Sequence, residues 1–137
     1  MYDEWIKRDF ALKSVKNSGC SLQYLSKRLQ NDKEIVMEAV KNDGFSLRYA
    51  SNKLRNDRDI VLKAMNTYKF SLYYASDELK NNKEFILEVL KCNRFCLLYA
   101  SNKMKKDRKL NHFFCCQVQF IECNVSIDSF EKLMIKF

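Results

Sequence analysis

A repeated phrase constrains this chain more than any other feature of its sequence. The segments Ser46–Leu54 (SLRYASNKL) and Ser71–Leu79 (SLYYASDEL) are closely similar and begin 25 positions apart. The related segments Ser21–Leu29 (SLQYLSKRL) and Cys96–Met104 (CLLYASNKM) keep the same interval. A period of this length within one sequence is typical of helical-repeat proteins. We therefore predict four copies, and the start of a fifth at Asp107, with these bounds: Lys7–Asn31, Asp32–Asn56, Asp57–Asn81 and Asn82–Lys106.

Each copy is expected to contain two short helices. Apolar residues at helical spacing, such as those between Ile35 and Val40, predict the first helix. A turn at Gly44 should follow, and Ser46 is a plausible cap for the second helix. The residues expected to cap the first helix in successive copies, through a side-chain oxygen that accepts from free backbone N–H groups, are Asp32, Asp57, Asn82 and Asp107.

The composition agrees with a helical array, because the chain has no proline and only two glycines in 137 residues. A single 25-residue hairpin cannot bury enough apolar surface to offset the entropy lost on ordering, whereas stacked hairpins cover one another. We predict an all-α fold, a short α-solenoid of stacked two-helix repeats over residues 1–110. Residues 111–137 depart from the pattern. They are interpreted as a C-terminal capping segment, with a degraded repeat as the alternative.

The segment from Asp32 to Leu54 reads D-x-E-x-V-x-x-A-V-K-N-x-G-x-S-L-x-Y-A-S-x-x-L. This pattern resembles the repeat of domain-of-unknown-function family 4116, found largely in protists, giant viruses and some intracellular bacteria. The resemblance covers about three quarters of the chain, roughly Arg8 to Arg108. It implies a helical repeat in multi-copy proteins without an established biochemical activity. It implies no catalytic residues.

Residues 25 positions apart hold the same place in successive copies, and each such set of residues is called a column. Two kinds of column could serve recognition. A tyrosine recurs once per copy, at Tyr24, Tyr49, Tyr74 and Tyr99. These rings either form an exposed stripe or pack between layers, and we favour packing because fixed columns in repeats usually maintain stacking. A partner lying across the stack would instead be recognised by a column whose residues differ between copies. The candidate partner-binding residues of this column are Gln23, Arg48, Tyr73 and Leu98.

A basic column and a formal net charge of +8 raise nucleic acid as a partner. The column contains Arg8, Lys33, Arg58, Lys83 and Arg108. Each of the first four bases is followed directly by an acid, so a solvated helix start is the favoured interpretation. We expect another protein as the partner, bound by an interaction or scaffold module. A basic adaptor for nucleic acid or a ribonucleoprotein is the alternative, and a degraded repeat protein without a partner is a third possibility.

The sequence favours a protein without catalytic residues, metal or cofactor. It has one histidine and neither a glycine-rich phosphate loop nor a nucleophile elbow. A zinc set of His112, Cys115, Cys116 and Cys123 is disfavoured, because adjacent cysteines rarely both reach one tetrahedral ion. Cys92 and Cys96 are interpreted as incidental. Without a secretory signal or an apolar stretch of membrane-spanning length, we expect an intracellular, cytoplasmic protein whose thiols stay reduced.

Overall fold

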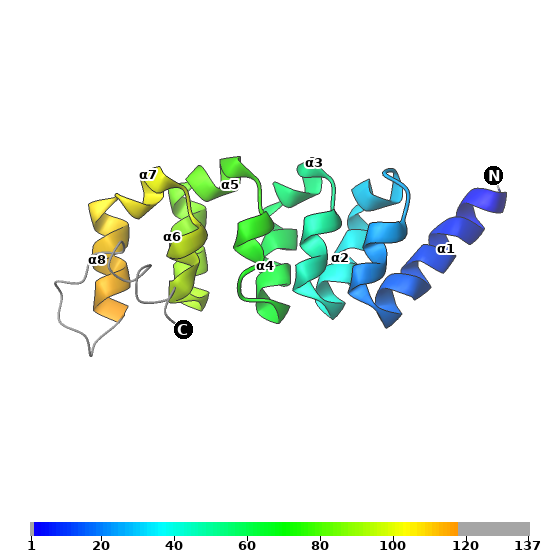
Figure 1. Cartoon of the computed structure of the whole chain (residues 1–137), viewed down its shortest axis with the longest axis horizontal. Coiled ribbons are helices and arrows are strands. Elements are labelled where there is room, and N and C mark those ends of the chain that lie inside the picture. Colours follow the sequence, from blue (N-terminus) through cyan, green and yellow to red (C-terminus); the bar gives the residue numbers. More distant parts are fainter. Residues whose placement is uncertain (1, 118–137) are drawn as a thin grey trace. The chain divides into compact units, whose positions relative to one another are not determined.

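The computed structural model describes residues 2–117, and every regular element in this range is a helix (Figure 1). The all-α helical repeat predicted from the sequence is confirmed. The chain divides into two compact units between Leu79 and Lys80. The predicted boundary at residue 110 falls inside a helix, and most of the predicted capping segment, residues 118–137, lies outside the described residues. Whether that segment is a cap or a degraded repeat stays a prediction.

The first unit contains three repeats. Its elements are α1 (Tyr2–Asn17), η1 (Gly19–Tyr24), η2 (Leu29–Asn31), α2 (Lys33–Asn42), η3 (Gly44–Tyr49), α3 (Asn52–Arg55), α4 (Arg58–Thr67), η4 (Ser71–Tyr74) and the start of α5 (Asp77–Asn81), where η denotes a 3-10 helix. Helix α2 lies between α1 and α4 and contacts both (Figure 1). Successive repeats of this unit are therefore stacked side by side, and the first helix of each forms one layer.

The second unit continues the same order of elements. After the end of α5 it contains α6 (Lys83–Cys92), η5 (Arg94–Tyr99), α7 (Asn102–Lys105) and α8 (Arg108–Gln117). Helix α6 contacts η5, and α7 contacts α8. Because α8 is formed, the fifth copy begins as a regular repeat despite the lysine at position 109, where earlier copies have an acid.

The predicted caps of the first helices are confirmed. The carboxylate of Asp32 accepts hydrogen bonds from the backbone N–H groups of Glu34 and Ile35, at 3.0 and 3.3 Å. Asp57 repeats this arrangement one layer later, and Asn82 caps α6 by accepting from the N–H of Phe85 at 2.9 Å. These side chains satisfy donors that an isolated helix leaves free, and so fix where each helix starts.

The second half of each repeat differs from the continuous helix that the sequence predicted. It consists of a 3-10 helix, a break and a very short helix, because Ala50 and Ser51 have extended backbone angles. Ser46 is not a cap: it is buried within η3, and its hydroxyl donates to the carbonyl of Asp43 at 2.6 Å. The cap of the short helix is Ser51, which accepts from the N–H of Leu54 at 3.3 Å.

The serine column also joins successive layers. The N–H of Ser51 donates to the carbonyl of Gln30 at 3.0 Å, and the N–H of Ser76 donates to that of Arg55 at 2.9 Å. In the second unit, Ser101 donates to the carbonyl of Lys80 at 3.2 Å. The breaks of the second, third and fourth repeats are thus tied to the end of the preceding repeat, which provides partners for backbone groups at the break.

The core is built from the apolar columns. The leucines at the second position of the repeated phrase are almost fully buried, and they are Leu22, Leu47, Leu72 and Leu97. The apolar face of α2, from Ile35 to Val40, contributes four residues with no exposed surface. Burying a side chain of this size stabilises a fold by about 1.5–3 kcal/mol. Burial of these apolar columns is therefore the main stabilising contribution.

Candidate recognition surface

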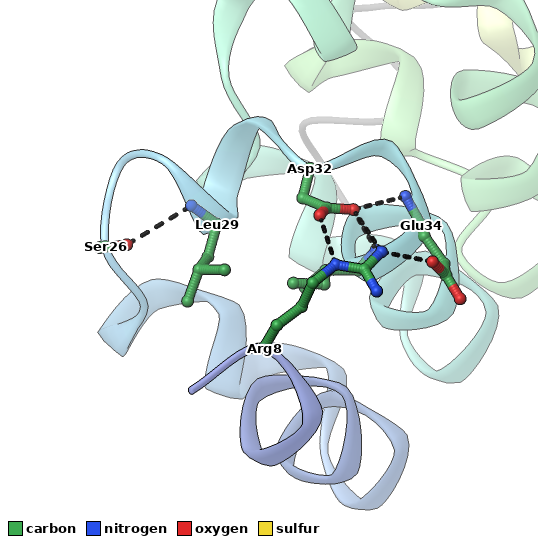
Figure 2. Close-up of polar contacts among 6 residues, drawn as sticks. Arg8, Ser26, Leu29, Asp32 and Glu34 are labelled. Carbon is green, nitrogen blue, oxygen red and sulfur yellow. Dashed lines mark hydrogen bonds and ion pairs between the residues drawn. The ribbon is translucent and has the colours of Figure 1, made fainter. Parts of the chain in front are cut away.

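The basic column serves as a set of links between repeats. Figure 2 shows the guanidinium of Arg8 against Asp32 and Glu34 of the next repeat. The Nε atom of Arg8 lies 2.9 Å from Oδ2 of Asp32. The next layer repeats the contact, with Nζ of Lys33 2.7 Å from Oδ2 of Asp57. A base on the first helix of one repeat therefore pairs with the residue that caps the first helix of the next repeat.

The second unit contains the same link, between Nζ of Lys83 and Oδ2 of Asp107 at 2.5 Å. Arg58 also has interactions within the structure, and Arg108 is exposed. The sequence interpretation of this column as a solvated helix start was therefore incomplete. Arg8, Lys33 and Lys83 each pair with a carboxylate of the following repeat, because stacking places that carboxylate within reach of the base.

These ion pairs perturb the titration of the capping carboxylates. Burial acts to raise the pKa of Asp32 and of Asp57. The hydrogen bonds from Arg8 and Lys33, together with those from backbone N–H groups, outweigh it, so both pKa values lie below the usual range. The hydrogen bond from Lys83 likewise lowers the pKa of Asp107. The carboxylates that cap the helices are thus held in their charged form.

A cluster of aromatic rings with one arginine lies on the second halves of repeats two and three. We call it the Arg48 cluster, and it comprises Phe45, Arg48, Tyr49, Tyr68, Phe70, Tyr73 and Tyr74. Phe45 is central, with ring centroids of Tyr49, Tyr68 and Tyr74 at 6.3, 5.9 and 5.4 Å. All of these pairs are edge-to-face, the arrangement that aromatic quadrupoles favour.

The guanidinium of Arg48 rests on these rings. Its central carbon lies 5.2 Å from the ring centroids of Phe45 and Tyr49, and 5.9 Å from that of Tyr74. Such cation–π contacts hold the arginine in place while leaving its side chain exposed. Arg48 is therefore a cation oriented by rings, whereas Arg8 and Lys33 are oriented by carboxylates.

The Arg48 cluster presents apolar surface to solvent. Tyr73 is 61% exposed and Phe70 is 39% exposed, while Tyr49, Tyr68 and Tyr74 are half-buried. Burial raises the pKa of the Tyr74 hydroxyl above its ordinary value. The surface thus combines an oriented cation with exposed aromatic rings.

The structure brings together two of the four residues predicted from the variable column. Arg48 and Tyr73 both contact Tyr74, whose ring centroid is 5.1 Å from that of Tyr73. Gln23 is exposed, and Leu98 is half-buried in the second unit. Sequence reasoning missed Phe45, Tyr68 and Phe70. One sequence signal for two of these rings was available. Phe45 and Phe70 belong to one column, which is also aromatic in the fourth copy, at Phe95, and holds Cys20 in the first copy.

The tyrosine column falls between the two alternatives considered for it. Tyr49, Tyr74 and Tyr99 are half-buried, and Tyr24 is 83% exposed. The contacts of Tyr74 explain the intermediate burial, because one side of the ring packs on Phe45 of the preceding repeat. Packing between layers therefore describes Tyr74, whereas Tyr24 is an exposed ring.

The thiols resolved in the structure do not assemble a metal site. Cys96 is fully buried, and burial first, then the nearby Cys92, raises its pKa to about 12. Within the described residues there is no group of three or more histidine, cysteine or acidic residues that could hold a metal ion. The predicted rejection of a zinc set stays a prediction, since Cys123 and the side chains of Cys115 and Cys116 lie outside the described residues. In the same part of the chain, no helix combines the length and the apolar character needed to cross a lipid bilayer.

The fold and its internal period define the chain as a helical-repeat protein. The family model for the domain of unknown function DUF4116 matches residues 7–55, 32–80 and 82–110. These segments begin at the predicted starts of the first, second and fourth copies. The chain belongs to this family. No curated protein and no solved structure matches it.

Proposed function

We propose that the protein is a non-catalytic interaction module that binds another protein through the Arg48 cluster. The observation that carries this proposal is the oriented guanidinium of Arg48 beside the exposed ring of Tyr73, on the column that varies between repeats. Tyrosine and arginine dominate the energetics of protein interfaces, because both offer large contact areas together with hydrogen-bond donors. The ring contacts of Arg48 also reduce the entropy that this side chain would lose on binding.

Nucleic acid is the weaker candidate for the partner. Arg8, Lys33 and Lys83 would have to leave carboxylates of the neighbouring repeat before contacting phosphates. Affinity for nucleic acid comes largely from such phosphate contacts, and it falls steeply with salt. A protein partner that contacts the rings of the Arg48 cluster is much less sensitive to ionic strength.

The test is capture from lysate of the source cells with the tagged full chain, after nuclease treatment, at low and moderate salt. We compare the wild type with Arg48→Ala, Tyr73→Ala and the control Lys63→Ala, which alters an exposed residue on α4. The proposal expects a defined protein that survives nuclease and salt, is lost with both cluster variants and is retained by the control. Capture that the cluster variants leave unchanged would refute the site. Nucleic acid as the only material recovered, released by either treatment, would refute the proposed partner class.

A further inference from the structure

Arg48 differs from Arg8 and Lys33 in what holds its side chain. Arg8 and Lys33 are each paired with a carboxylate of the following repeat. Among the described residues, the contacts of Arg48 are with aromatic rings, and none of them is an ion pair. Arg48 is also exposed. It therefore presents to solvent a guanidinium that is oriented by rings and has no anionic partner in this part of the chain.

The acid at the start of η3 is already engaged elsewhere. Oδ1 of Asp43 accepts a hydrogen bond from the backbone N–H of Phe45 at 2.9 Å. Oδ2 of the same carboxylate accepts from the thiol of Cys20 at 3.2 Å. Both carboxylate oxygens of Asp43 thus serve the turn between α2 and η3, and its charge is not paired with the guanidinium of Arg48.

The segments that supply the Arg48 cluster carry positive charge only. Residues 44–49 and 68–74 contain two bases, Arg48 and Lys69, and no acid. Both bases are exposed. Because interfaces are arranged so that a positive surface meets a negative one, these segments favour a partner with negative charge.

The ring contacts leave the hydrogen-bond donors of Arg48 available. A guanidinium has five N–H donors in a planar fork. Cation–π contacts with Phe45 and Tyr49, each 5.2 Å from the central carbon to the ring centroid, use the charge and not these donors. A planar fork matches the two oxygens of a carboxylate through two parallel hydrogen bonds. Since the rings already orient the guanidinium, forming this pair costs less side-chain entropy than it would for a free arginine.

We propose that the partner binds Arg48 through an aspartate or glutamate carboxylate and packs an adjacent apolar side chain on Tyr73. This inference rests on the proposed function, because it specifies the chemistry that the Arg48 cluster recognises. The central carbon of Arg48 is 5.9 Å from the ring centroid of Tyr74, and the ring of Tyr73 is 5.1 Å from the same centroid. The cation and the exposed ring therefore flank one residue, and a single short acidic–apolar segment reaches both.

A carboxylate fits this site better than a phosphate or a nucleic acid strand. Phosphorylated motifs are bound by clusters of arginines, whereas the Arg48 cluster contains one. Single-stranded nucleic acids bind by stacking their bases on open aromatic faces. Here Arg48 lies over the rings of Phe45 and Tyr49, and Phe45 also packs edge-to-face with Tyr74. These rings are thus occupied in holding the cation.

The test is a selection on the wild-type full chain, under reducing conditions, from a displayed library of random peptides of about twelve residues. We expect enrichment of peptides with an acid next to an aromatic or aliphatic residue. A selected peptide is then synthesised and its binding measured by fluorescence anisotropy. Changing its acid to the amide, or Arg48→Ala in the protein, should weaken binding at least about tenfold, equivalent to about 1.4 kcal/mol. The amide change leaves the protein untouched, so its effect does not depend on how a variant folds.

The matched control in the protein is Lys63→Ala, which removes an exposed base from α4 and should bind the peptide like the wild type. A charge exchange adds a gain of function. Arg48→Glu should abolish binding of the selected peptide, and replacing the peptide's acid with arginine should restore binding to this variant. Restoration requires direct contact between the two charges, because a general loss of structure would not be reversed by a change in the peptide.

The outcomes separate this inference from the proposed function. Peptides that need Tyr73 but neither Arg48 nor an acid would overturn the inference and leave the proposed interaction site standing. Peptides bound equally by wild type, Arg48→Ala and Tyr73→Ala would count against the site itself. A library that yields no binder would overturn the inference alone, since lysate capture tests the proposed function separately. Binding of a single-stranded RNA probe that Arg48→Ala abolishes would overturn both the inference and the proposed partner class.

Discussion

Replacing Gly44 with alanine should destabilise the first unit, although alanine is normally the better helix former. Gly44 opens η3, and its backbone has no positive φ angle. The residue is therefore not needed for its conformational freedom. A Cβ atom added here would lie 2.0 Å from the carbonyl oxygen of Ala64 and 2.8 Å from Oγ1 of Thr67. Both atoms belong to the helix of the next repeat, which passes over the glycine.

The expected loss in the free energy of unfolding follows from the atoms that the added Cβ would displace. The 2.0 Å contact is more than 1 Å short of an ordinary carbon–oxygen separation, and its partner is the backbone of a buried residue. Overpacking a well-packed interior costs about 1–3 kcal/mol. Because Thr67 also uses its hydroxyl to reach the carbonyl of Val40 at 2.8 Å, a shift of α4 disturbs a second link between layers. We expect a loss near the upper end, about 3 kcal/mol.

The assay is urea unfolding followed by circular dichroism, with Lys63→Ala on the exposed side of α4 as the control. The midpoint should fall for Gly44→Ala at an unchanged slope, whereas the control should stay within about 0.5 kcal/mol. If conformational entropy decided the outcome instead, alanine would stabilise by about 0.4–1 kcal/mol. A midpoint that is unchanged or raised would refute the explanation by close approach.

Two further predictions concern titratable groups. Because the pKa of Asp57 is lowered on folding, its contribution is complete above the unfolded value of 3.8 and is lost as pH falls below it. Asp57→Asn, which keeps a cap of the kind that Asn82 provides but removes the charge that binds Lys33, should lessen the loss of stability between about pH 5 and pH 3, measured by urea midpoints. An unchanged acid profile would contradict this. In the native protein at pH 8, the thiol of Cys96 should alkylate at least about a hundredfold more slowly than that of Cys92, measured by peptide mass spectrometry. Equal rates would show that Cys96 is accessible.

The sequence predicted only part of the candidate site. The variable column selected Arg48 and Tyr73, and the structure places both in one cluster. Phe45, whose ring contacts Arg48, was not selected, because its contact with Tyr74 joins different repeats, 29 positions apart. A column pattern reports which positions are alike, but it carries no information on which column of one layer meets which column of the next.

What the sequence determined by itself is the local order of the chain. The period, the starts of the first helices and their buried faces all follow from interactions between residues a few positions apart, such as Asp57 with the N–H of Ile60. These interactions need no knowledge of the neighbouring layer. For that reason the caps of the first helices were predicted residue by residue, and the family resemblance followed the same columns.

Only the tertiary structure decided how the layers use their side chains. The pairing of Lys33 with Asp57, 24 positions later, depends on the distance and angle between successive repeats. The break after η3 depends on a carbonyl supplied by the preceding repeat. Each is a contact between segments about one repeat apart, and stacking geometry fixes such contacts after the local rules have formed the helices.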